Sequence, residues 1–110
     1  MKKISKEDIT NIIKQIKDHI DKLSIYNVFG FREEDEIEIA KYLSSAINSK
    51  YREDRLDNLI CVISYCGAVF PIMIIGDLYS QKKLNKNEHD SLLECVDAAH
   101  ILYDIKTHLY

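Results

Sequence analysis

An uncharged run of 18 residues, 59–76 (LICVISYCGAVFPIMIIG), lies in the middle of a chain of only 110 residues. A membrane-spanning helix usually needs about 20 apolar residues, so this run is at the lower limit of length. Gly67 and Pro71 interrupt it, and a proline inside a free helix costs roughly 3 kcal/mol. Arginines precede the run and lysines follow it, so the flanking charges favour neither side. We therefore expect the run to be buried inside the protein and not to cross a membrane.

The same run predicts two buried helices that meet at a break between Gly67 and Pro71. The whole chain has three Gly and one Pro, and so few turn residues favour a few long helices over many short strands. The segments LICVISY and AVFPIMIIG are rich in β-branched residues and are also compatible with short buried strands, because periodicity alone does not separate the two. We expect an all-α fold, with residues 1–110 forming one domain of about five helices around the central pair.

The first helix is predicted to begin after Ser5, a residue suited to an N-cap. Isoleucines then recur at helical spacing from Ile9, and this apolar stripe extends to Leu23. The next segment, 24–31 (SIYNVFGF), breaks the pattern around Gly30, and we expect it to be a loop rich in aromatic residues.

Four further helices follow from apolar spacing and from capping signals such as Asn85 with Glu88 three residues later. In chain order they are expected at residues 33–47, from about 53 to 66, from 71 to about 83, and from 85 to about 108. The first of these four is expected to turn its apolar residues inward: Ile37, Ala40, Leu43, Ala46 and Ile47.

The overall charge and the cysteines exclude several functions. A net charge of −3 and a pI near 5.8 disfavour nucleic-acid binding, which needs a basic stripe. The three cysteines form no C-x-x-C pair, and we expect all three to be small buried hydrophobic residues.

No apolar segment follows the opening MKKIS, so no secretory signal is visible and we expect a cytoplasmic location.

A run of carboxylates at the start of the second predicted helix is the strongest candidate for a binding surface. Carboxylates in a first turn complement the helix dipole by roughly 0.3–1 kcal/mol each, but one or two would suffice. A solvated helix start and a surface for a basic partner are both compatible with this excess. The candidate set joins the acidic run to the aromatic residues before it: Glu33, Glu34, Asp35, Glu36, Glu38, Tyr26, Phe29 and Phe31.

The last predicted helix carries a second acidic stripe, from which Asp97 and Asp104 complete the candidate partner-binding set. A solvated outer face is the ordinary explanation of such a stripe. His100 and His108 share a side of this helix with Asp104, but no third metal ligand from another element is evident, so we expect no metal site. Whether the two acidic regions form one surface stays open at this point.

Catalysis is not expected, because the chain has no G-x-S-x-G, no phosphate-binding glycine loop and no H-E-x-x-H. No residues suggest a bound cofactor. The seven tyrosines are scattered, and no basic patch accompanies them. We therefore expect a binding protein and not an enzyme.

The size, the acidic segment FREEDEIEIAKYLSSAI and the lack of catalytic motifs resemble the small all-helical immunity proteins of bacterial contact-dependent or polymorphic toxin systems. Such proteins bind a cognate nuclease toxin domain and block its substrate site. The resemblance implies a basic toxin domain as partner, with carboxylates of this chain occupying a cationic cleft that otherwise holds a phosphate. The alternative is a non-catalytic structural or regulatory module that self-associates through its surplus of Tyr and Ile. The sequence leaves monomer and homodimer open.

Overall fold

The computed structural model describes residues 3–108, apart from the side chain of Lys22. The described chain is all-helical and contains no strand, which confirms the predicted fold class. It has six α-helices where about five were expected, together with one short 3₁₀-helix, η1. The elements are α1 (Lys6–His19), α2 (Lys22–Phe29), η1 (Glu33–Asp35), α3 (Glu36–Asn48), α4 (Arg52–Cys66), α5 (Val69–Ser80) and α6 (Lys86–His108).

The uncharged run forms the second half of α4 and most of α5, with the predicted break at Gly67 and Ala68. Gly67 has a positive φ of 75°, a conformation that costs glycine little, and Pro71 lies in the first turn of α5. Within residues 3–108 no single helix has the length and hydropathy of a membrane span; α4 and α5 meet that criterion only together, and they are bent by 117° at the break.

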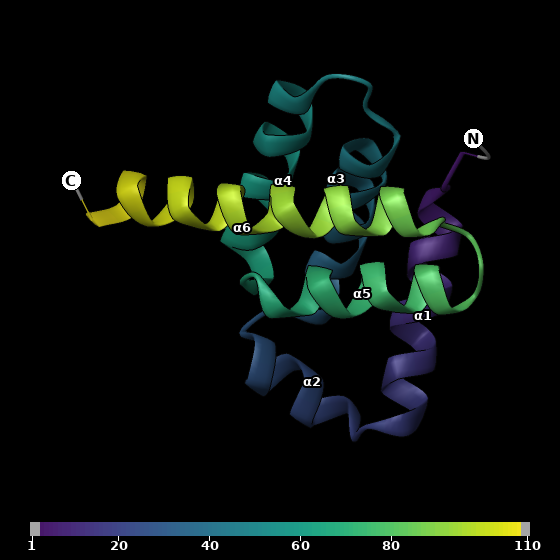
Figure 1. The fold of residues 1–110 in the computed structure, drawn as a ribbon. Coiled ribbons are helices and arrows are strands. Elements are labelled where there is room, and N and C mark those ends of the chain that lie inside the picture. The colour runs from purple at the N-terminus through teal and green to yellow at the C-terminus, as the bar shows by residue number, and fades with distance from the viewer. Residues whose placement is uncertain (1–2, 109–110) are drawn as a thin grey trace.

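The helices pack around this bent pair. A three-residue link joins α3 to α4, and the two helices lie side by side, while α6 crosses α4 and runs along α5 (Figure 1). On the other side of the core, α1 contacts α3 and α5. The C-terminal turns of α6 extend beyond the rest of the molecule (Figure 1).

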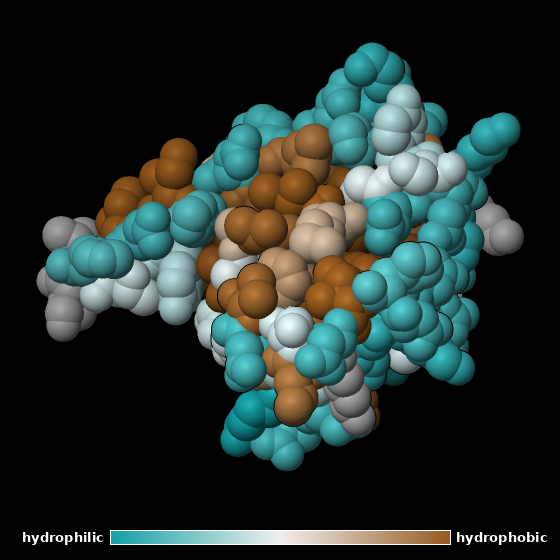
Figure 2. All heavy atoms as spheres, turned by 90° about the horizontal axis from the view of Figure 1, so that it is seen from below, coloured by the Kyte–Doolittle hydropathy of each residue, from teal (hydrophilic) through white to brown (hydrophobic). Residues whose placement is uncertain are grey.

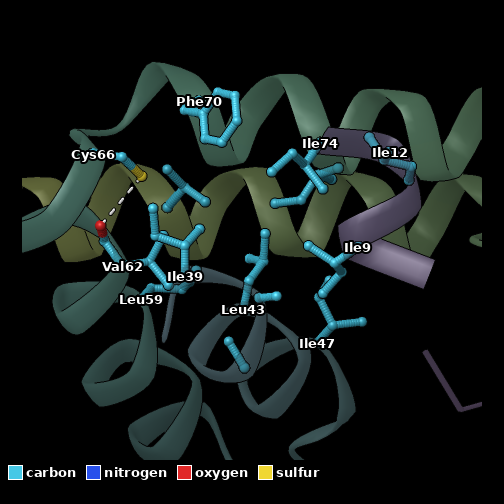
Figure 3. Close-up of a cluster of buried hydrophobic side chains, with 14 of the residues drawn as sticks. Ile9, Ile12, Ile39, Leu43, Ile47, Leu59, Val62, Cys66, Phe70 and Ile74 are labelled. Carbon is cyan, nitrogen blue, oxygen red and sulfur yellow. Dashed lines mark hydrogen bonds between the residues drawn. The ribbon is translucent and has the colours of Figure 1, made fainter. Parts of the chain in front are cut away.

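The core forms where α1, α3, α4 and α5 converge. Figure 3 shows their side chains pointing toward one another, and Leu43, Leu59, Phe70 and Ile74 among them are 0% exposed. Cys66 belongs to this cluster, and burial raises the pKa of its thiol to about 12, so that the reactive thiolate is disfavoured. Cys95 is buried as well, whereas Cys61 is only partly so.

The expectation of a loop at 24–31 is wrong, because most of this segment belongs to α2. The first helix stops at His19, and Asp21 caps a new helix by accepting a hydrogen bond from the Leu23 N–H at 3.3 Å. Gly30 then ends α2 in the left-handed conformation, with the Phe31 N–H donating to the Tyr26 carbonyl as in a Schellman motif. Leu23, expected to extend the buried stripe, is 68% exposed.

The end of α5 also differs from the prediction. The helix stops at Ser80, three residues before the expected end, and Lys82 adopts a positive φ of 62°. The Lys83 N–H donates to the Leu78 carbonyl across this turn, so a lysine occupies the position that glycine usually takes. Periodicity carries no signal for such a turn, which is why the boundary was misplaced.

Candidate partner-binding surfaces

Asp35 is the first carboxylate of the acidic run that the structure places inside the fold. Its side chain is only 12% exposed, and Oδ2 accepts a hydrogen bond from the Arg32 N–H at 2.9 Å. That backbone hydrogen bond and the Arg32 guanidinium lower the pKa of Asp35. Asp35 therefore closes the turn between α2 and α3, and little of its side chain is exposed.

Glu36 is the second inward-facing carboxylate. It lies between the Lys17 ammonium, 3.0 Å from Oε1, and the Tyr26 hydroxyl, which donates a short hydrogen bond to Oε2. The side chains of Lys17 and Glu36 are 20% and 14% exposed. Burial and the neighbouring Glu36 carboxylate raise the pKa of Tyr26. This network joins α1, α2 and α3 to one another, so Glu36 serves the fold.

The three aromatic residues expected to contact a partner all pack against the core. Phe31 is only 4% exposed, and its ring lies 5.0 Å from the ring of Phe70, centroid to centroid. Phe29 lies 4.9 Å from Phe70, and Tyr26 makes an edge-on contact with Phe31 at 5.3 Å. Tyr26 and Phe29 remain partly exposed, so a contact with a partner stays a prediction for them, whereas Phe31 belongs to the core.

Three carboxylates of the acidic run, Glu33, Glu34 and Glu38, lie at or near the surface. Glu34 pairs with Arg32 at 3.0 Å, and Glu38 lies 4.0 Å from the Lys41 ammonium.

Ile37 lies among these carboxylates. It was expected to face the core but is 72% exposed. The sequence already indicated this outward position, because Ile37 lies about 120° from the buried Leu43 around an ideal helix.

The segment 97–108, called here the projecting end of α6, combines exposed carboxylates with exposed apolar residues. Ala99 and Tyr103 still contact the core, and the last turns extend beyond it (Figure 1). Ile101, Leu102 and Ile105 are 61%, 39% and 48% exposed, and Asp97 and Asp104 lie on the same part of the helix. Figure 2 shows hydrophobic side chains gathered on this projection. Asp97 and Asp104 were predicted from the sequence to face a partner, but the three apolar residues were not, because helical periodicity alone assigns such residues to a buried seam.

The two acidic regions belong to helices that both pack against α4. Helix α4 contacts α3 on one side and α6 on another (Figure 1). Arg52 of α4 forms a bidentate ion pair with Glu94 of α6. The molecule therefore offers two candidate surfaces on two helices, the outer start of α3 and the projecting end of α6.

The histidine-containing segment of α6 forms local contacts. His100 lies 3.7 Å from the Asp104 carboxylate, while His108 Nδ1 lies 2.8 Å from the Asp104 backbone carbonyl oxygen. Among residues 3–108 no three His, Cys, Asp or Glu side chains converge in a way that could hold a metal ion.

Comparison of the chain with protein-family models, with curated proteins and with solved structures gave no match.

The turn that Asp35 closes is expected to weaken in acid. Folding lowers the pKa of Asp35, so the ionised carboxylate stabilises the folded protein. This stabilisation is fully present above the unfolded pKa near 3.8 and is lost as the pH falls through the lower pKa of the folded state. We expect Asp35→Asn to cost roughly 1–2 kcal/mol at pH 7 and to flatten the dependence of unfolding free energy on pH between about 5 and 2. Urea titrations at several pH values measure this. An unchanged slope, or an equal change in the exposed control Asp57→Asn, contradicts it.

Proposed function

We propose that this chain is a non-catalytic binding protein that neutralises a basic protein partner, in the manner of an immunity protein that blocks a bacterial nuclease toxin. The observation that carries the proposal is the projecting end of α6, where three large apolar side chains are exposed beside two aspartates. The resemblance seen in the sequence adds the class of partner.

Exposed apolar residues next to carboxylates suit recognition of a basic protein. Burial of the apolar side chains would supply affinity, at roughly 25 cal/mol for each Å² removed from water. The carboxylates would accelerate association with a positively charged surface and set its orientation. Because the last turns of α6 extend beyond the body of the protein (Figure 1), a concave site could receive this end of the helix, where Ile101 and Ile105 are exposed.

The outer start of α3 is the competing surface. Glu34 and Glu38 lie around the exposed Ile37, but both carboxylates already have basic neighbours in Arg32 and Lys41. Its local charge is therefore partly neutralised, whereas Asp97 has no ion-pair partner within the described part of the chain. For this reason we place the main contact on α6.

Charge reversal separates the two surfaces. We expect Asp97→Lys with Asp104→Lys to slow association with the partner at least about tenfold at low ionic strength and to weaken its salt dependence. The test partner is the protein encoded by the neighbouring gene, studied by stopped-flow mixing. The same change of charge at Glu53 and Asp57, on the first turns of α4, is the control and should have a smaller effect.

Two outcomes would reject parts of the proposal. If Glu34→Lys with Glu38→Lys slows association while the α6 variant behaves as wild type, the contact lies on α3. If the wild-type chain neither binds the neighbouring gene product nor restores growth of cells that produce it, the immunity function is wrong.

The exposed apolar residues of α6 also favour a second candidate, self-association. In that case sedimentation should show dimers at micromolar concentrations, and Ile101→Ser with Ile105→Ser should abolish them. A monomer throughout this range rejects the second candidate.

A further inference from the structure

A cavity of about 220 Å³ lies where the end of α3, the first turns of α4 and the start of α6 meet. Its apolar lining comes from Ile47, Leu84 and Leu92, each of which is almost fully buried. The polar side chains of Arg55, Asn87, Glu88 and Ser91 complete the wall. The cavity is separate from the projecting end of α6, which lies at the other end of that helix.

Arg55 is held in position by two hydrogen bonds, and no carboxylate among residues 3–108 pairs with it. Its Nε–H donates to the Ser49 carbonyl at 2.9 Å, and Nη1 contacts the Ser91 hydroxyl at 3.4 Å. Within the described part of the chain no acidic group lies within 4.0 Å of the guanidinium, and Nη2 has no partner. An arginine held in this way presents its remaining N–H donors as a fork that matches a carboxylate.

Glu88 supplies a fixed negative charge to the same cavity. Its Oε1 accepts a hydrogen bond from the Asn85 N–H at 2.8 Å, and the Glu88 N–H donates to Asn85 Oδ1 at 2.8 Å. This reciprocal capping box orients the side chain. The second carboxylate oxygen has no partner among residues 3–108 and remains able to accept a hydrogen bond.

We infer that this cavity binds a free aliphatic α-amino acid. The ligand carboxylate pairs with Arg55, its ammonium group pairs with Glu88, and its side chain contacts the apolar lining. The volume of the cavity suits a ligand as small as an amino acid, because pockets for drug-sized ligands measure about 300–1,000 Å³ and this one is smaller. A purely apolar ligand would bury the remaining N–H donors of the Arg55 guanidinium without an acceptor, and a simple anion would leave the apolar lining uncovered.

Titration of the full chain with L-leucine, followed by amide chemical shifts, tests the inference. We expect saturable shifts around Ser91 and Leu92, with a Kd on the order of 1 mM for so small a ligand. Glycine, leucine amide and 4-methylpentanoate remove the side chain, the carboxylate charge and the ammonium group in turn, and each should bind at least about tenfold more weakly. No saturable shift up to about 20 mM leucine, or glycine binding as tightly as leucine, overturns the inference.

Variants test the two charged contacts separately. Arg55→Gln should weaken leucine binding at least about tenfold, and so should Glu88→Gln, whose amide oxygen still accepts the Asn85 N–H of the capping box. Arg52→Gln removes a neighbouring arginine of α4 and should leave leucine binding unchanged. Unchanged binding in both cavity variants overturns the inference. If Arg55→Gln does not fold, because it loses the contact with Ser49, the wild-type ligand series and Glu88→Gln decide the question.

Discussion

Replacing Phe70 with alanine is expected to lower the free energy of unfolding by about 3–5 kcal/mol. The ring is 0% exposed and contacts both Phe29 and Phe31, whose centroids lie 4.9 and 5.0 Å away. The substitution leaves a cavity and removes the surface on which α2 and the turn before α3 pack. A domain of this size has only about 5–15 kcal/mol of stability, so the loss is a large part of the total.

Denaturant titration of the variant, compared with Val69→Ala, measures this effect. Val69 precedes Phe70 on the same helix but is 61% exposed, so its truncation should change the stability by less than about 0.5 kcal/mol. Comparable losses in the two variants would show that the ring contacts around Phe70 do not carry the stability assigned to them.

The second large effect is expected from Glu36→Ala, at about 2–3 kcal/mol. The substitution leaves the Lys17 ammonium and the Tyr26 hydroxyl without their shared acceptor in a partly buried site, since Lys17 is 20% exposed. Most of this loss reflects the unpaired charge that remains. Lys17→Met in the same background should therefore recover a substantial part of it.

A double-mutant cycle measured by denaturant unfolding gives the coupling between Lys17 and Glu36. Glu34→Ala is the matched control, because its ion pair with Arg32 has side chains that are 68% and 74% exposed and should contribute little. If Glu34→Ala is as costly as Glu36→Ala, or if Lys17→Met deepens the loss, the network does not act as described.

The carboxylates of the acidic run fall into two groups, one that stabilises the fold and one that is available to a partner. Glu36 and Asp35 hold the start of α3 in place, so charge reversal there would test folding and not binding. A binding experiment is informative only at exposed carboxylates such as Glu34, Asp97 and Asp104. This distinction rests on burial and could not be drawn from charge alone.

Much of the architecture could be read from the order of residues. The uncharged run at 59–76 predicted two buried helices, and the break near Gly67 followed from glycine and proline. Ser5 was identified as an N-cap, and it forms a reciprocal capping box with Asp8. These features are local, because a turn residue or a cap acts within a few positions of itself.

The sequence by itself determined the all-α class, the break between α4 and α5, and the presence of surplus carboxylates. Only the tertiary structure decided that Phe31 packs inward, that Ile37 and Ile101 face outward, and that Glu36 joins three helices. A helix has one apolar side by periodicity, but whether another element covers that side depends on contacts between residues far apart in the chain. Burial and pairing across such distances are properties of the packed molecule, and they determine which charged and apolar groups remain available to a partner.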